Sequence, residues 1–229
     1  MKKVLNSNSL KFIAIGAMLL DHLAYAFFAH NLFLYIIFRT IGRITAPIMF
    51  FMLANGYSFT RSKFNYGRRL ILFALISQIP YSLFIANKVF LFNSYNILFT
   101  LFLGFLCLVS LYDVKNKFLK IFFILVCTFL SYFCEYGPFA IALILMFSIC
   151  KDVRIRNVCF SLICVLYLFI KSIIDSSLTW FIVSWGMFLV IPLLNLYNGE
   201  KGHLKVKYLF YVFYPAHLLI LVVVKSFVL

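Results

Sequence analysis

Charged residues are scarce in this 229-residue chain, and acidic residues are the scarcest of them. Asp, Glu, Lys and Arg make up only 12% of the chain, and just six residues are acidic. Apolar residues make up 65%, against roughly one half in a soluble domain, and the mean hydropathy is +1.06. One soluble globule of this size cannot bury that much apolar surface. The composition therefore excludes a soluble domain and predicts a multi-pass protein of the lipid bilayer.

Several chemical motifs are missing as well. None of the six cysteines belongs to a Cys-x-x-Cys pair, which argues against a disulfide framework or a zinc site. The sequence has no glycine-rich phosphate loop and no cluster of metal ligands, so no bound metal is expected. The net charge of +15 would suggest nucleic acid in a soluble protein, but here the basic residues form short clusters between apolar runs. We interpret them as signals of membrane topology and expect no nucleic-acid partner.

Nine apolar stretches are candidates for membrane-crossing helices, each of which needs about 20 residues. They are residues 10–30, 33–57, 68–87, 95–112, 118–134, 137–150, 157–174, 177–197 and 207–228. The loops between them are too short for a second domain, and no internal repeat is visible. Residues 1–229 are therefore predicted to form a single all-α domain, a polytopic transmembrane bundle of about nine helices.

The basic residues between these stretches predict an orientation, because cytoplasmic loops carry an excess of Lys and Arg. With the N-terminus in the cytoplasm, the inside segments collect sixteen of the 21 basic residues and the outside segments three, while Arg39 and Arg43 fall within the second helix. This split favours a cytoplasmic N-terminus and a location in the inner, or cytoplasmic, membrane of the cell. Ala24-Tyr25-Ala26 resembles a signal-peptide cleavage site, but the apolar run continues past it, so we expect the first helix to be retained.

A few ionisable residues inside the predicted helices are not explained by topology. A charge at the bilayer centre costs about 2.5–3.5 kcal/mol on insertion scales, so such residues usually face a partner or a cavity. The set is Asp21, His22, Arg39, Arg43 and His217. Asp21 and His22 are adjacent and do not face each other on an ideal helix. Asp21 is expected to pair across helices with Arg43 or Arg39, which share a face at a spacing of i, i+4.

Lys11 and His22 lie on one stripe of the first predicted helix. They are eleven residues apart in the sequence, which places them within roughly 20° of each other around the axis and about 16 Å apart along it. A cation at the headgroup level and a titratable imidazole deeper in the membrane suit a long anionic cofactor entering from the cytoplasm. At this point three roles stay open for His22, namely catalysis, proton transport and packing, and Lys11 could equally be a snorkelling anchor.

Six segments, in order along the chain, resemble the TraX family of membrane proteins, which is named for the conjugative F-pilin acetylase. The final segment is the most specific, and residues 113–134 and 150–195 carry little of the resemblance. The segments are LKFIAIGAMLLDHLAY, IGRITAPIMFFMLANGYSFTRS, RRLILFALISQIPYSL, YNILFTLFLG, EYGPFAI and YNGEKGHLKVKYLFYVFYPAHLLIL.

The resemblance implies a membrane enzyme that moves an acetyl group from acetyl-CoA to an acceptor, either the N-terminus of a membrane-inserted peptide or an envelope glycan. The chain is also similar to the wider membrane acyltransferase-3 group, in which a basic residue, ten intervening residues and a catalytic histidine stand on the first helix. Lys11 and His22 match this spacing. His22 is thus implied as the general base, and Arg43, held by Asp21, is expected to orient the site or stabilise the oxyanion.

The remaining expected roles concern binding. Lys11, with Arg61 or Arg68, would hold the phosphates of acetyl-CoA by charge. His217 and Arg39 are expected on the acceptor side. Two other classes of function stay open, namely a proton-coupled transporter that uses the membrane Asp, His and Arg as a relay, and a non-enzymatic assembly factor for a pilus or secretion machine.

Overall fold

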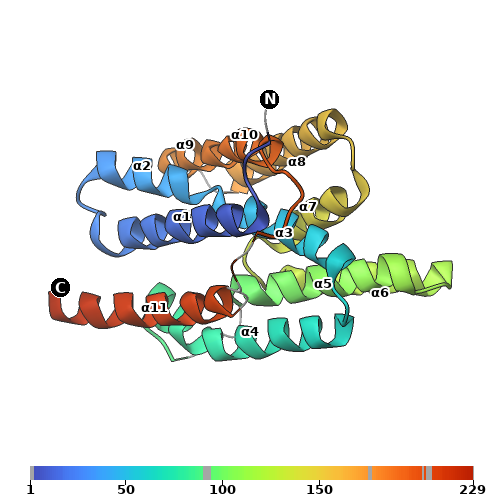
Figure 1. Cartoon of the computed structure of the whole chain (residues 1–229). Helices are drawn as coiled ribbons and strands as arrows, with labels where there is room; N and C mark the ends of the chain where they lie inside the picture. Colours follow the sequence, from blue (N-terminus) through green and yellow to red (C-terminus); the bar gives the residue numbers. More distant parts are fainter. Residues whose placement is uncertain (1–2, 90–93, 175–176, 203, 205–207, 229) are drawn as a thin grey trace. The chain divides into compact units, whose positions relative to one another are not determined.

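The computed structural model describes residues 3–89, 94–174, 177–202, 204 and 208–228, and every regular element within them is a helix (Figure 1). The elements are α1 Ser7–Phe27, α2 Leu32–Gly42, α3 Thr45–Phe59, α4 Lys63–Ala86, α5 Ile97–Asp113, α6 Lys117–Ser131, α7 Gly137–Ile149, α8 Val153–Ile174, α9 Leu178–Ser184, the 3-10 helix η1 Trp185–Leu189, α10 Val190–Asn195 and α11 Leu209–Val228. The prediction of an all-α fold is confirmed.

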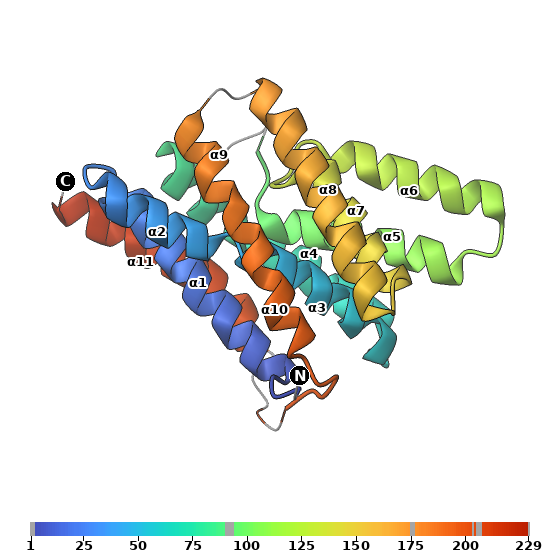
Figure 2. The same ribbon diagram turned by 90° about the horizontal axis from the view of Figure 1, so that it is seen from above.

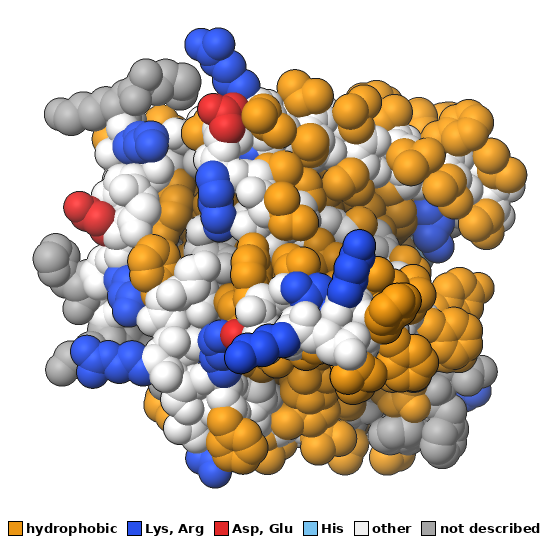
Figure 3. All heavy atoms as spheres, turned by 90° about the vertical axis from the view of Figure 1, so that its right-hand side faces the viewer, with side chains coloured by type: hydrophobic (Ala, Val, Ile, Leu, Met, Phe, Trp, Pro, Cys, Tyr) orange, Lys and Arg blue, Asp and Glu red, His pale blue; other side chains and the backbone are white. Residues whose placement is uncertain are grey.

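Several of these helices are long and apolar enough to cross a membrane. Within the described residues they are six stretches, Ser7–Phe27, Leu32–Phe59, Lys63–Ala86, Val153–Ile174, Leu178–Asn195 and Leu209–Phe227. α5 and α7 are shorter apolar helices. Hydrophobic side chains cover much of the surface in Figure 3, and on α6 the rings of Phe118 and Phe129 are exposed, as expected for residues that face lipid. The chain is a multi-pass helical membrane protein.

Two of the nine predicted stretches are found as candidate membrane spans, but neither is one continuous helix. The stretch 33–57 ends as α2 at Gly42 and begins again as α3 at Thr45, with Pro47 in the first turn of α3, where its missing N–H is not needed. The stretch 177–197 changes to the tighter η1 before α10. There Pro192 cannot donate a hydrogen bond to the carbonyl four residues earlier.

Six helices begin at an asparagine or serine whose side chain accepts a hydrogen bond from a backbone N–H of the first turn. Such caps satisfy donors that have no partner inside the helix. They are Asn6 for α1, Asn31 for α2, Ser62 for α4, Asn96 for α5, Asn116 for α6 and Ser177 for α9. The loops before these six helices therefore supply the polar residues at which the helices start.

The helices are grouped in two compact units. Unit 1 consists of residues Met1–Met49, Asp152–Phe213 and His217–Leu229. Within it α2 packs against α1 and also against α9 and η1, while α8 packs against α9 and η1 (Figures 1 and 2). The antiparallel pair α1 and α2 carries most of the ionisable residues that the sequence places inside the membrane.

Unit 2 consists of residues Phe50–Lys151 and Tyr214–Ala216. Its central helix is α5, which contacts α4, α6 and α7, and Figure 2 shows α5 and α6 as a hairpin. Leu103, Cys107, Cys127 and Ile141 form a buried apolar cluster between α5, α6 and α7. The single-domain organisation of residues 1–229 stays a prediction.

The first testable prediction concerns Gly186, where η1 meets α2. A Cβ at position 186 would overlap the backbone carbonyl of Thr40. Gly186→Ala should therefore push η1 away from α2, at a cost of about 1–3 kcal/mol, and lower the apparent Tm of the detergent-solubilised protein by several degrees. Gly16→Ala is the matched control, because nothing lies within 4 Å of a Cβ there. Its Tm should stay unchanged or rise, and an unchanged Tm for Gly186→Ala would contradict the close contact.

Candidate active site

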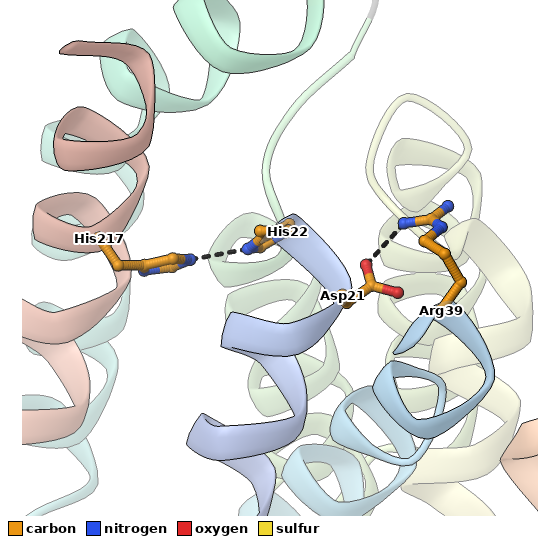
Figure 4. A network of polar contacts seen from close by, with 4 residues as sticks. All are labelled: Asp21, His22, Arg39 and His217. Carbon is orange, nitrogen blue, oxygen red and sulfur yellow. Dashed lines mark hydrogen bonds and ion pairs between the residues drawn. The ribbon is translucent and has the colours of Figure 1, made fainter. Parts of the chain in front are cut away.

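The two adjacent polar residues of α1, Asp21 and His22, point to different sides of the helix. Figure 4 shows Asp21 directed at α2 and His22 directed at α11. Successive residues of an α-helix are rotated by about 100° around its axis, so neighbours in sequence serve different faces. The expectation that these two side chains do not face each other is confirmed.

Asp21 forms an ion pair with Arg39 of α2. Arg39 Nη1 donates to Asp21 Oδ2 at 2.7 Å, and the two side chains are only 17% and 16% exposed. The expected pairing of Asp21 across helices is thus confirmed, with Arg39 as the partner. Arg43, one turn further along, lies within Coulombic range of Asp21. Asp21 thus contacts α2 directly through Arg39.

Two further features fix this ion pair. A Cβ at Gly42 would overlap the side chain of Asp21, so only glycine lets the carboxylate lie this close to the backbone of α2. The guanidinium of Arg39 also lies over two tyrosine rings, 5.6 Å from the centroid of Tyr25 and 5.7 Å from that of Tyr35. A cation over an aromatic face is attracted by the ring's quadrupole. Arg39 is therefore held on three sides.

His22 meets His217 of α11. His22 Nδ1 and His217 Nε2 are 2.7 Å apart, and the ring centroids are 4.9 Å apart with an interplanar angle of 19°. His217 is 4% exposed, and its Nδ1 lies 2.7 Å from the backbone oxygen of Phe213, one turn earlier on the same helix. Its ring stacks on the Phe213 ring at 4.8 Å. The sequence placed both histidines among the candidates but did not predict that they touch.

The hydrogen bonds define which nitrogens carry protons when both rings are neutral. A carbonyl oxygen only accepts, so His217 Nδ1 must be the donor to Phe213. A neutral His217 then has an unprotonated Nε2, which accepts from His22 Nδ1–H. By the same rule Nε2 of a neutral His22 carries no proton. The arrangement therefore presents His22 Nε2 as the basic atom.

Lys11 lies on the same face of α1 as His22. Its Nζ is 5.3 Å from the centroid of the Phe210 ring of α11, and the neighbouring Phe12 ring is 5.7 Å from the same ring. Lys11 and His22 thus both meet α11, which confirms that they share one face. Along α1 the contacts run from Lys11 to His22, and along α11 from Phe210 to His217, so the two helices run in the same direction.

Arg61 and Arg68, the other two residues expected to bind the cofactor, belong to unit 2. Arg61 lies in the connection before α4, Arg68 lies on the first turns of α4, and both side chains are exposed. Their role stays a prediction, as do the acceptor-side roles of His217 and Arg39. Within the described ranges, no three His, Cys, Asp or Glu side chains gather in a way that could hold a metal ion.

Unit 2 contains a cluster of polar side chains whose hydrogen bonds join the segments RRLILFALISQIPYSL, YNILFTLFLG and EYGPFAI. Asn96 Nδ2 donates to Gln78 Oε1 at 2.9 Å and to the backbone oxygen of Ala74 at 2.8 Å. Glu135 Oε2 accepts from the backbone N–H of Ile97 at 2.9 Å, at the first turn of α5. A carboxylate is stabilised at a helix N-terminus. These residues join α4, the start of α5 and the loop before α7.

The fold and the site define a class, that of multi-pass helical membrane proteins with a hydrogen-bonded histidine pair between two parallel helices. A family model described as "TraX protein" matches residues 6–225, and the chain belongs to the TraX family. The chain is also similar to the probable fimbrial assembly protein FimC, serogroup H1, of Dichelobacter nodosus, with 31% identity over 231 residues and 95% of each chain covered. No solved structure matches the chain.

The second prediction tests the ion pair. Asp21→Asn should leave the Arg39 guanidinium without its counter-charge, and breaking a buried pair from one side costs about 3–5 kcal/mol. Arg39→Gln should have a similar effect on Asp21. The double variant should be more stable than either single variant, because neither Asp21 nor Arg39 is then left charged without the other. Thermal unfolding in detergent measures all three proteins, and additive losses in the double variant would contradict the pairing.

Proposed function

We propose that this protein is a membrane-embedded acetyltransferase that moves an acetyl group from acetyl-CoA to an amine or hydroxyl acceptor. The observation that carries the proposal is the hydrogen-bond chain from Phe213 through His217 to His22, which leaves His22 Nε2 as a base of fixed orientation. A general base must be held within reach of the proton that it removes. Membership of the TraX family supports the same reading.

In the proposed mechanism, His22 Nε2 takes the proton from the acceptor's N–H or O–H as that atom attacks the thioester carbonyl carbon. The carbon–sulfur bond then breaks, and the acetyl group stays on the acceptor. His22 returns its proton to the departing thiolate, so the enzyme ends in its starting state. His217 accepts a hydrogen bond from His22 Nδ1–H. This bond keeps the His22 ring oriented during the reaction, as the third residue of a catalytic triad does.

Arg39 on α2 and Arg43, the residue just after α2, supply positive potential. Arg39 and Arg43 are both within Coulombic range of His22. A negative charge develops on the carbonyl oxygen during attack, and fixed positive groups stabilise it, usually as the largest single contribution to catalysis. We assign this role to Arg43 and leave Arg39 as the residue that anchors Asp21. Asp21 acts through α2 and does not touch the reacting atoms.

Acetyl-CoA would supply the activated thioester, and the residues along α1 fit its shape. Lys11 and His22 share a face and are about 16 Å apart along the axis of an ideal helix. Lys11 can hold phosphate at the membrane edge while the extended pantetheine arm runs along α1 toward His22. The cofactor's charged end then stays near water, and its reactive end lies in the apolar layer.

The acceptor that we favour is the amino terminus of a pilin subunit in the membrane. The similar protein from Dichelobacter nodosus carries the name of a probable fimbrial assembly protein, which supports a pilus context. The same name favours a second function, assembly without chemistry, in which the histidines serve only packing. An envelope glycan is the other acceptor class that the base at His22 would serve.

The third prediction separates enzyme from assembly factor. Purified wild-type protein should bind CoA and release thiol from acetyl-CoA, measured after its own cysteines are blocked. His22→Ala should keep CoA binding and lose turnover at least about a hundredfold, as expected for a general base. His30→Ala, which changes an exposed histidine just after α1, is the matched control and should behave as wild type.

The contrary results are distinct. A folded wild type that neither binds CoA nor consumes acetyl-CoA would refute the enzyme, and proton-coupled uptake into liposomes would then support a transporter. Normal turnover in His22→Ala would show that His22 is not the general base.

The fourth prediction tests His217 as a positioning residue. His217→Phe keeps the stacking on Phe213 but removes the acceptor for His22 Nδ1–H. It should lower kcat by about tenfold or more with an unchanged Kd for CoA, because it disturbs only the orientation of the base. His217→Gln should recover part of the loss, since its amide oxygen can accept the same hydrogen bond. Equal activity in the Phe and Gln variants would contradict this role.

A further inference from the structure

A loop from the far end of the chain lies along the start of α1. We call residues 196–202 the clasp. Three backbone hydrogen bonds hold it, from Leu5 N to Leu196 O at 2.9 Å, from Asn198 N to Leu5 O at 2.8 Å and from Ser7 N to Glu200 O at 2.8 Å. Just beyond it, Asn8 Nδ2 donates to Leu204 O at 3.0 Å. The proposed acetyl transfer assigns no role to this loop.

Gly202 allows the clasp to approach α1. Its φ is +77°, and a Cβ there would lie 2.8 Å from Asn6 Oδ1 and 2.9 Å from Asn8 Nδ2. Gly199 also has a positive φ, +86°, but nothing lies within 4 Å of its Cβ position. Both glycines are needed for their backbone conformation. Only Gly202 is needed for the contact with α1 as well.

The clasp brings a second cation to Lys11. Ser7 lies one turn before Lys11 on α1, and its backbone N–H donates to Glu200 O at 2.8 Å. This bond places the next residue of the clasp, Lys201, within Coulombic range of Lys11. The carboxylate of Glu200 accepts from Asn198 Nδ2 at 3.1 Å within the clasp itself. The first turn of α1 contains no acidic residue, and its helix dipole adds positive potential there. The backbone hydrogen bonds of the clasp keep these two like charges near each other, and an anion bound by both lysines would offset their repulsion.

We propose that Lys11 and Lys201 form a phosphate-binding site, with the clasp as its frame, and that its ligand is the diphosphate of CoA. This inference rests on the proposed function. Lys201 is exposed and Lys11 is partly buried, so the site lies where a water-soluble nucleotide can enter. His22 stands on the Lys11 face of α1, so phosphate held at this end directs the thioester toward the base.

The fifth prediction is measured as equilibrium binding of radiolabelled CoA to the full chain in lipid-free detergent. Lys201→Glu should weaken CoA about tenfold or more, since it replaces an attractive charge by a repulsive one. Lys151→Glu, the same change at another exposed lysine, should leave the affinity unchanged. Lys201→Glu should weaken the binding of dephospho-CoA as much as that of CoA, because both ligands contain the diphosphate. The binding of pantetheine, which has no phosphate, should not change in this variant.

Substitutions of Gly202 and Gly199 test the role of the clasp without changing any charge. Gly202→Ala should displace the clasp from Asn6 and Asn8 and weaken CoA binding by about threefold or more, while Gly199→Ala, equally strained in φ, should weaken it less. Equal effects of the two variants would overturn the clasp as the frame of the site.

The remaining outcomes are separable. If wild type binds CoA and Lys201→Glu binds it equally well, this site is wrong while the acetyltransferase proposal stands. If Lys201→Glu changes only the response of the protein to phosphatidylglycerol in nanodiscs, the site holds a lipid headgroup and the CoA assignment is overturned. If Lys201→Glu weakens CoA but not dephospho-CoA, the ligand is the 3′-phosphate and the diphosphate assignment is overturned. If wild type binds no CoA, both proposals fall together.

Discussion

The ion pair between Asp21 and Arg39 is the contact on which the site depends. Charges in a bilayer need a partner, and this pair gives α1 only one acceptable rotation against α2. Once Asp21 faces α2, the helical rotation per residue turns His22 to another face, toward α11. Gly42 and the two tyrosines around Arg39 serve the same end, because they let the carboxylate lie close and hold the guanidinium still.

The face of α1 that meets α11 carries the two side chains to which we assign binding and catalysis, Lys11 and His22. Near its start Lys11 lies over an aromatic ring and beside the clasp, and deeper in, His22 is bonded to His217. A backbone carbonyl orients this histidine pair. A neutral orienting group needs no counter-charge, which suits a site inside an apolar layer where each buried charge is costly.

Much of the fold was predictable because it follows from composition and length. Long apolar runs can be satisfied in lipid only as helices, so nine helical stretches could be located from the sequence. Their interruptions at residues 43–44 and 185–189 were not predicted, since apolar periodicity is unchanged there and the breaks depend on Pro47, Pro192 and close packing at Gly186. Orientation in the membrane and the number of domains remain predictions.

The site was predictable as a set of residues but not as a set of contacts. Rare ionisable residues inside apolar runs singled out Asp21, His22, Arg39, Arg43 and His217. Helical spacing could not choose between Arg39 and Arg43, because both stand on the same face of α2. The His22–His217 bond joins positions 195 residues apart, and no local pattern encodes such a distance. The clasp was missed for the same reason, since its hydrogen bonds use backbone atoms that every residue has.

The parallel course of α1 and α11 has a consequence for the membrane topology of the chain. Both helices enter the bilayer from the face on which Lys11 and Phe210 lie and leave it on the other. The amino end of α1 and the carboxyl end of α11 therefore lie on opposite sides of the membrane. A reporter fused before α1 and one fused after α11 would sample opposite sides of the membrane, and the number of crossings between them must be odd.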